Sequence, residues 1–470
     1  MKNHSIENKL NRNYDHQLMP SQISVCYSGI QFMIITLAIL FTVACTKPLE
    51  LTPAQVLTNE TALSTDASVK QVLIGAYDEM ALDGLFGGEV LRNSELFAGE
   101  GEVVWVGTFV APREIFNRDI LVANGDVEAF WAEAYNCINI CNNILSALDV
   151  VNEEDRARVE GEAKCLRGWM LFELTRYFAQ SYEPGQNNTQ PGVPIVLKPT
   201  IVIDESSTPA RSTVEECYAQ VITDLTEAES LLPESNDVFV DQMVVASLLA
   251  RVYLQQSNFE NARDAADRVI ASGNYSLMPA YKDAFNQVEN TKEDIFAIQI
   301  SEQDGENAMN EYFATASNGG RRDILIEDAH LALYPSGDLR EDLFYTSQGD
   351  YLSGKWKNQY ANIPIIRLAE MFLIRAECNQ RLGTATGAAP LDDYNKVHTR
   401  AALPAATTVS LDDILMERRL ELAHEGFKYH DVKRLKGIVG TMPYNDNKLI
   451  YPIPQRELEV NKNLVQNQGY

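Results

Sequence analysis

The sequence contains few of the residues from which metal sites, disulfide frameworks and hydrolase active sites are built. Its 470 residues include seven cysteines and six histidines, only four of the latter beyond residue 44. The Gly-x-Ser-x-Gly turn that carries the nucleophile of many hydrolases is absent. The five cysteines beyond Cys45 are scattered through apolar, helix-like segments, so we expect small buried side chains. A chain this long can bury a large core without disulfides.

One segment looks like a zinc-binding motif but has the wrong spacing. In "ELAHEGFKYHDVKRL", residues 421–435, His424 and Glu425 are followed by His430. An H-E-x-x-H zinc site needs histidines four residues apart, on one face of a helix. Six helical steps turn the second histidine about 120° away from the first. We therefore predict no metal site here and expect His424 to be structural.

Basic residues are scarce relative to acidic ones. Lys and Arg number 39, whereas Asp and Glu number 66, and the formal net charge is −27. Such a chain repels the phosphate backbone of nucleic acids, so the composition argues against a nucleic-acid partner.

Only one long apolar run occurs, close to the N-terminus. The sixteen residues 29–44 are short for a membrane-spanning helix and suit the core of an export signal. The run ends before Cys45 in a pattern that resembles a bacterial lipobox, although a threonine stands where leucine is usual. We expect a lipoprotein signal peptide over residues 1–44 and a lipidated Cys45. The alternatives are an uncleaved anchor or an ordinary secretory signal, and Met19 or Met33 are alternative starts.

Beyond this leader, apolar residues recur mainly at helical spacing. In residues 126–151, Trp131 and Ile138 share one face, and residues 153–180 carry Trp169 on a similar apolar stripe. We expect both tryptophans to lie in the core.

Residues 243–276 look like a tetratricopeptide unit. Leu249, Ala250 and Tyr253 match its first helix, and Ala262 matches the small residue where the second helix crosses the first. Similar stretches recur in two other long helical segments. We therefore predict a mainly α-helical fold, a tetratricopeptide-like superhelix of helical pairs with irregular, loop-rich insertions and a few short strands.

Helical periodicity fades between about residues 278 and 362. "IFAIQIS", residues 295–301, has the pattern of a short strand, and the rest is rich in Gly, Ser, Asn and aromatic residues. Long irregular segments inside a compact domain are usually functional. Helical patterns return at residues 363–383, where Gly383 is a C-cap signal, and at residues 410–426.

Four C-terminal segments together resemble the signature blocks of one known family, in the same order. They are "IPIIRLAEMFLIRAECNQRLG" (363–383), "YNKVHTRAALP" (394–404), "ILMERRLELAHEGFKYHDVKRL" (414–435) and "LIYPIPQRELEVNKNLVQNQGY" (449–470). The chain thereby resembles the SusD/RagB family, and the lipobox and helical pairs extend the resemblance over nearly all of the exported chain. In this family, residues matching Glu417, Arg418, Arg419 and Glu421 make the ion pairs that hold the C-terminal part on the helical scaffold.

The resemblance implies a lipoprotein on the outer face of the outer membrane of a member of the Bacteroidetes. Such proteins capture a nutrient, commonly an oligosaccharide and sometimes a peptide, and deliver it to a SusC-like TonB-dependent transporter, without catalysis, metal or cofactor. The implied domains are a signal peptide (1–44), a lipid anchor and tether (45–60) and one SusD-like domain (61–470). The last has a helical part (61–277) and a loop-rich ligand and signature part (278–470).

Sugar capture needs aromatic faces and planar polar side chains on pre-formed loops. In two irregular regions where the family places ligand contacts, we expect two tryptophans as stacking platforms with polar and apolar support beside them. The predicted ligand-binding residues are Trp105, Phe109, Arg113, Asn117, Arg322 and Trp356. For Trp105, flanked by valines, a half-buried position in a hairpin is the alternative.

Two other functions are compatible with the sequence. One is a tetratricopeptide-like scaffold that binds proteins through its concave face. The other is a hydrolase that uses His424 and Glu425 or a pair of carboxylates, which the spacing and the lack of a nucleophile motif disfavour. The choice between glycan and peptide does not follow from the sequence.

Overall fold

The computed structural model describes residues 62–201, 207–301 and 305–470. The expected signal peptide, the tether and Cys45 lie outside these residues. All described residues belong to one compact unit. In this part of the chain, none of the helices combines the length and the apolar character needed to cross a membrane.

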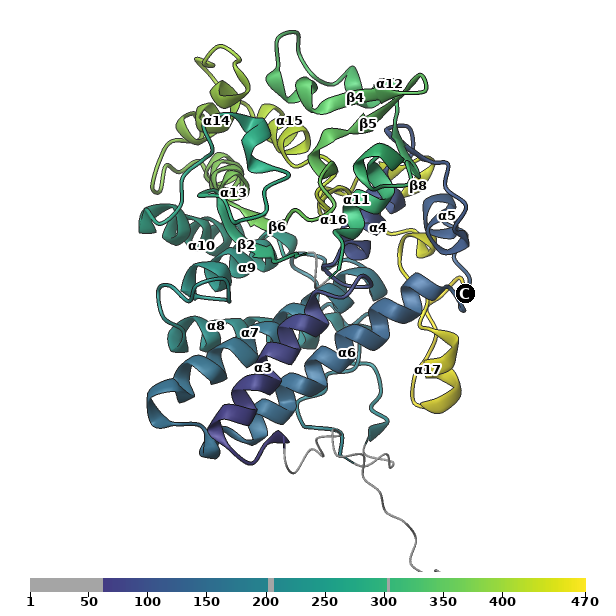
Figure 1. The fold of residues 1–470 in the computed structure, drawn as a ribbon, viewed down its shortest axis with the longest axis vertical. Helices are drawn as coiled ribbons and strands as arrows, with labels where there is room; N and C mark the ends of the chain where they lie inside the picture. Colours follow the sequence, from purple (N-terminus) through teal and green to yellow (C-terminus); the bar gives the residue numbers. More distant parts are fainter. Residues whose placement is uncertain (1–61, 202–206, 302–304) are drawn as a thin grey trace, which may run out of the picture. The chain divides into compact units, whose positions relative to one another are not determined.

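Packed helices make up most of the described chain (Figure 1). The principal ones are α3 (Asp66–Met80), α6 (Gly125–Ser146), α7 (Glu153–Phe178), α8 (Val214–Leu231), α9 (Gln242–Gln255), α10 (Phe259–Ser272), α13 (Leu368–Leu382), α14 (Pro390–His398) and α15 (Leu411–Glu421). From α6 to α10 each helix packs against the next, and α10 then packs against α13. The predicted mainly α-helical architecture of helical pairs is confirmed.

Local sequence sets the ends of these helices. Thr213 and Glu216 form a capping box at the start of α8: the Thr213 hydroxyl accepts a hydrogen bond from the Glu216 amide at 3.2 Å, and the Glu216 carboxylate accepts one from the Thr213 amide at 2.8 Å. Gly383, with φ of 66°, ends α13. These caps satisfy backbone groups that have no partner inside the helix.

The helices enclose an aromatic and aliphatic core. Trp131 and Trp169 are buried, as predicted, and the Trp169 ring lies 4.9 Å from that of Phe86 and 5.3 Å from that of Phe296. The five cysteines of the described residues are buried and form no disulfides. They act as small apolar side chains.

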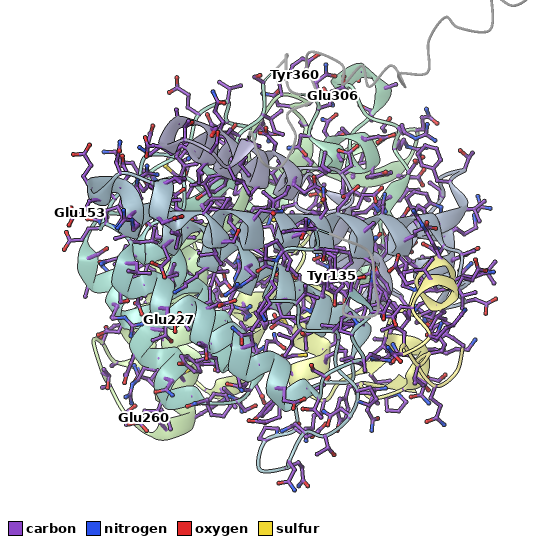
Figure 2. The ribbon with its side chains drawn as sticks, turned by 90° about the horizontal axis from the view of Figure 1, so that it is seen from below. Tyr135, Glu153, Glu227, Glu260, Glu306 and Tyr360 are labelled. Carbon is purple, nitrogen blue, oxygen red and sulfur yellow. The ribbon has the colours of Figure 1, made fainter. Side chains whose placement is uncertain are left out.

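Several acidic residues lie on the solvent side of the helices. Glu153 of α7, Glu227 of α8 and Glu260 of α10 are exposed, and Figure 2 shows them spread over the helical side of the molecule. These carboxylates contribute negative charge to a solvated surface.

Short strands join loop regions that are far apart in the sequence. A four-stranded antiparallel sheet has the spatial order β1 (Val103–Trp105), β3 (Ile324–Ile326), β5 (Asp350–Ser353) and β4 (Phe344–Ser347). Trp105 lies opposite Ile324, so the residues after β1 lie beside those before β3. A second antiparallel pair, buried throughout, consists of β2 (Asp294–Ile298) and β6 (Ile363–Arg367).

Shorter elements complete the described chain. They are α4 (Glu89–Ala98), α5 (Val110–Asn117), α11 (Ala308–Phe313), α12 (Asp328–Leu331), α16 (Lys428–Arg434), α17 (Gln455–Val460), β7 (Ile438–Val439) and β8 (Met442–Pro443), with short 3₁₀ turns such as η6 (Gly354–Trp356) between them. Helix α4 packs against α5, α11, α16 and β1, and so connects the sheet to the C-terminal part.

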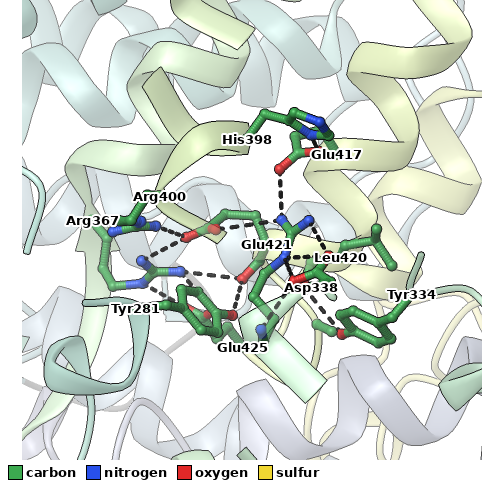
Figure 3. A network of polar contacts seen from close by, with 12 residues as sticks. Tyr281, Tyr334, Asp338, Arg367, His398, Arg400, Glu417, Leu420, Glu421 and Glu425 are labelled. Atoms are coloured by element: carbon green, nitrogen blue, oxygen red, sulfur yellow. Dashed lines mark hydrogen bonds and ion pairs between the residues drawn. The ribbon is translucent and has the colours of Figure 1, made fainter. Parts of the chain in front are cut away.

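A buried network of charges attaches α15 to the rest of the fold (Figure 3). The Glu421 carboxylate accepts hydrogen bonds from Arg400 and, at 3.1 Å, from Arg367, and Arg340 lies 3.7 Å away. Arg367 also pairs with Glu293 at 2.5 Å. Because Arg367 ends β6 and Glu293 directly precedes β2, the network fixes α15 against this strand pair.

The neighbouring signature residues are paired as well. Glu417 accepts from Arg340 at 2.6 Å and lies 2.9 Å from His398, and Arg418 pairs with Asp431 at 2.9 Å. Arg419 pairs with Glu102 beside β1. The predicted ion pairs of the signature helix are therefore confirmed, and they reach both the helical scaffold and the sheet.

Replacing the central carboxylate destabilises the protein. We expect Glu421→Gln to lower the free energy of unfolding at pH 7 by about 3–5 kcal/mol, because it leaves buried guanidinium groups uncompensated. The matched control is Glu229→Gln, which removes a partly exposed partner of Arg268 and costs about 0–1 kcal/mol. Urea unfolding of both variants measures the difference, and equal losses would show that burial adds nothing to the pair.

Acid weakens the same network. Burial raises the pKa of Glu421, but Arg400, Arg367 and Arg340 outweigh this effect and lower the pKa to about 2, below the ordinary 4.5. A carboxyl whose folded pKa is depressed contributes stability above its unfolded pKa and loses it as the pH falls through the folded value. We expect the free energy of unfolding to fall between about pH 4.5 and pH 2, by about 3 kcal/mol from this group. Urea unfolding at several pH values in this range gives the dependence of the free energy of unfolding on pH. This dependence should be weaker for Glu421→Gln than for the wild type, and an equal dependence would mean that Glu421 does not contribute to it.

Candidate ligand-binding face

Two loop regions meet where β1 pairs with β3. The Val106 amide donates a hydrogen bond to the Asp323 carbonyl at 2.8 Å, which extends the pairing beyond Trp105. Phe109 and Arg321, far apart in sequence, are thereby brought into contact, with the guanidinium carbon 4.1 Å from the centroid of the phenyl ring. We call the surface formed by Phe109, Arg113, Tyr312 and Arg321 the Phe109 face.

The Phe109 ring lies at the surface on a stack of other side chains. Phe109 is 40% exposed, although Arg321 covers one face of its ring. The rings of Tyr312 and Phe109 meet edge to face, with their centroids 6.5 Å apart. The guanidinium carbon of Arg92 lies 4.2 Å from the centroid of the Tyr312 ring. Val106 and Val110 beside Phe109 are exposed. The arrangement offers a partly exposed apolar ring with a positive group on one face.

Trp105 lies beneath this face. It is 7% exposed and packs against Tyr312 with ring centroids 6.0 Å apart. Gly107 permits this packing, since a Cβ there would lie 2.5 Å from the Trp105 ring and 2.5 Å from Asp323. Trp105 is thus more buried than the half-buried hairpin position considered as the alternative, and it lies in β1, paired with the distant β3. It supports the platform from below.

Trp356 is fully enclosed and offers no ring face to a ligand. It is 2% exposed, and its Nε1 donates a hydrogen bond to the His424 carbonyl at 3.0 Å. Its own carbonyl accepts a hydrogen bond from Asn310 at 2.8 Å. The prediction that Trp356 is a stacking platform is therefore wrong: the indole is used to fix the turn after α15.

The predicted polar residues divide between two places. Arg113 and Asn117 are exposed on α5, four residues apart and hence on one face of the helix, and Arg113 donates to the Gly107 carbonyl at 2.9 Å. Arg322 has a φ of 62° and turns toward the β4–β5 hairpin, where it pairs with Asp350. The structure joins Arg113 to the Phe109 face and places Arg322 away from it.

Two residues of the Phe109 face were not predicted. Arg321 is adjacent to Arg322, and only the strand pairing decides which of the two reaches Phe109. Tyr312 lies in a segment without periodicity that folds as the short helix α11. Burial raises the pKa of the neighbouring Glu311. Arg321 acts in the opposite direction, since its Nε lies 3.7 Å from the Glu311 carboxylate. The face therefore combines aromatic, guanidinium and carboxylate groups.

The histidines of the signature segment are structural. His424 is buried with a φ of 64°, its ring lies 4.7 Å from that of His330, and burial lowers its pKa well below the ordinary value. His430 packs edge to face on Tyr177 at 4.9 Å. Glu425 pairs with Lys355 at 2.6 Å. In residues 62–201, 207–301 and 305–470, no group of three or more His, Cys, Asp and Glu side chains is arranged to hold a metal.

Two family models match the chain. A model described as "Starch-binding associating with outer membrane" matches residues 49–254, and the model of the SusD family matches residues 344–449. The chain belongs to the SusD family. The family inferred from the C-terminal blocks is confirmed. The description of the first model associates its members with the outer membrane.

Relatives and solved structures agree with this membership. The "SusD-like protein P2" of Formosa agariphila is 24% identical over 94% of this chain and 100% of the relative. A putative sugar binding protein from Bacteroides vulgatus is 26% identical, with a TM-score of 0.77 over 86% of this chain and 99% of that chain. Surface glycan-binding protein A from Bacteroides uniformis is 24% identical, with a TM-score of 0.72 over the same shares. The SusD-like fold is thereby established.

Stability measurements separate the platform from its support. Trp105→Ala should lower the free energy of unfolding by about 3–5 kcal/mol, because it leaves a large cavity under the sheet. Phe109→Ala should cost about 1 kcal/mol or less, because its ring is partly solvated and loses mainly its contact with Arg321. Urea unfolding of both variants tests this order, and a larger loss for Phe109→Ala would mean that Phe109 is a core residue.

Proposed function

We propose that this SusD-family protein is a cell-surface lipoprotein that captures an oligosaccharide at the Phe109 face and delivers it to a SusC-like TonB-dependent transporter. The observation that carries the proposal is an exposed aromatic ring, edged by planar polar groups, on paired loops of a SusD fold. The sugar-binding and glycan-binding titles of similar structures support the ligand class.

The chemistry of the face suits a sugar. The exposed part of the Phe109 ring packs against the apolar side of a sugar ring, and Arg113 and Arg321 present donors to its hydroxyl groups. Asn117, about one helical turn beyond Arg113, offers an amide to a longer ligand. Because β1 and β3 hold both loops in place, little conformational entropy is lost on binding. The Phe109 face performs no chemical step: it binds the ligand and releases it to the transporter.

Anchoring is the second part of the proposal. Cleavage before Cys45 and acylation of its thiol attach the chain to the outer face of the outer membrane, in keeping with the description of the family model. A single acyl signal gives weak attachment, so more than one chain on the N-terminal cysteine is required for stable anchoring.

A calorimetric screen of the purified protein against plant, host and microbial oligosaccharides and a peptide digest tests the ligand. We expect an oligosaccharide to bind, and Phe109→Ala to weaken its binding at least tenfold, about 1.4 kcal/mol, because the variant lacks the ring against which the sugar packs. The control is Leu197→Ala, which removes a similarly exposed apolar side chain from the loop after α7. Binding that survives Phe109→Ala unchanged would place the site elsewhere, and exclusive peptide binding would change the ligand class.

Acylation is tested separately in a bacterial host that processes lipoproteins. We expect a radiolabelled or alkyne-tagged fatty acid to label the wild type and to be absent from Cys45→Ala, which should be found in the soluble fraction. Labelling of Cys45→Ala would contradict the proposed attachment site.

A further inference from the structure

A cavity of the described residues lies apart from the Phe109 face. It has a volume of about 470 Å³ and is bounded by α15, α16, β7 and the turn between α4 and β1. Its wall includes Glu102, Leu415, Arg419, Lys428, Val432 and Ile438. None of the four residues that define the Phe109 face contributes to it. The size is that of a small-molecule site.

One end of this cavity carries an excess of fixed positive charge. Arg419 and Lys428 both donate to the same oxygen of Glu102, whose other oxygen lies 2.9 Å from His330 Nδ1. Two permanent cations thus share one carboxylate, and burial lowers the pKa of His330, which keeps this ring neutral at pH 7. Burial also raises the pKa of the nearby Glu95 to about 7, so this carboxyl carries less than a full charge.

The other carboxylates of the wall do not cancel this excess. Glu100 pairs with Arg118, outside the cavity wall, and Asp431 pairs with Arg418 and with a second arginine. Asp412 lies two helical turns from Arg419 along α15, about 10 Å away at a rise of about 1.5 Å per residue. The Arg419 Nε is buried and has no hydrogen-bond partner among the described residues.

The aliphatic end of the cavity begins at Met416, about one helical turn from Arg419. Met416 on α15, Leu435 after α16 and Ile438 in β7 are all large apolar side chains left 37–68% exposed, and all three line the cavity. Leu415 and Val432 add apolar side chains to the wall. Aromatic rings are few in this wall, where Phe427 is the single Phe, Tyr or Trp. An aliphatic groove of this kind fits a hydrocarbon chain better than a sugar ring.

We propose that this cavity binds a small aliphatic carboxylate, whose carboxylate pairs with Arg419 and Lys428 while its hydrocarbon chain covers Met416, Leu435 and Ile438. The ligand carboxylate joins Glu102 in compensating the two cations, which gives each a carboxylate of its own. The hydrocarbon chain removes three exposed apolar side chains from water. The site is independent of the glycan-binding proposal, because the two surfaces share no residue.

Calorimetry with sodium octanoate as the probe tests the inference on the purified protein. We expect saturable binding at one site, and Arg419→Met should weaken it at least tenfold, about 1.4 kcal/mol. Octanamide keeps the hydrocarbon chain and lacks the charge, so it should bind to the wild type at least tenfold more weakly than octanoate does. Its affinity should be the same for the wild type and for Arg419→Met. The matched control is Arg268→Met, which removes another partly exposed, ion-paired arginine from a helix outside the cavity.

A second variant tests the aliphatic end without touching the ion pairs. Leu435→Asp places a charge at an exposed position and should weaken octanoate and octanamide alike, with thermal unfolding unchanged within a few degrees. Octanoate binding that is equal in wild type, Arg419→Met and Leu435→Asp would locate it elsewhere and overturn the proposal. The absence of octanoate binding would overturn it too, as would binding of octanamide as tight as that of octanoate.

Discussion

Glu421 lies among the guanidinium groups of Arg340, Arg367 and Arg400 in the protein interior, and the placement of the C-terminal half depends on this contact. Taking an ion out of water costs several kcal/mol, and only a partner in good geometry offsets that cost. Each member of the network is therefore stable only when the others are in position. Helix α15 has in consequence one allowed orientation against β2 and β6.

This orientation is passed on to the ligand-binding face through a series of contacts. The carbonyls of Glu421 and Ala423, at the end of α15, accept hydrogen bonds from Lys355 at 3.0 and 2.8 Å, and that of His424 accepts one from Trp356. Lys355 and Trp356 form η6, which follows β5 directly. Strand β5 pairs with β3 and β3 with β1, which leads into Phe109. A structural helix remote from the ligand thus holds the loops that contact it.

Much of the helical scaffold could be predicted from the sequence, because helical periodicity and caps are local signals. The stripe through Trp131, the capping box at Thr213 and the C-cap at Gly383 are all found as expected. The signature helix was also identified, since charged residues such as Glu417 and Glu421 can enter a packed helix only in pairs. The family followed from these same blocks.

The candidate site was predicted less well, because its geometry depends on non-local pairing. Three-residue strands such as β1 and β3 leave no periodic signal, so the partner of Trp105 and the proximity of Arg321 to Phe109 are invisible in the sequence. Trp356 stands in a Gly- and Lys-rich segment that looks exposed. It is buried because Lys355 pairs with Glu425 and because Lys355 and Trp356 donate hydrogen bonds to three carbonyls of the α15 turn. No local sequence pattern indicates these distant contacts.

The central claim, that the α15 turn positions the ligand-binding loops, is tested most directly by hydrogen exchange of Lys355→Met. This change removes the two hydrogen bonds from Lys355 to the turn, keeps the one from Trp356 to His424, and leaves Glu425 paired with Arg367 at 2.7 Å. We expect amide exchange in Lys355→Met to be faster than in the wild type in β5, β3, β1 and the loop to Phe109, and to be unchanged in α6 and α7. Faster exchange confined to η6, with the sheet and the loop as protected as in the wild type, would contradict it.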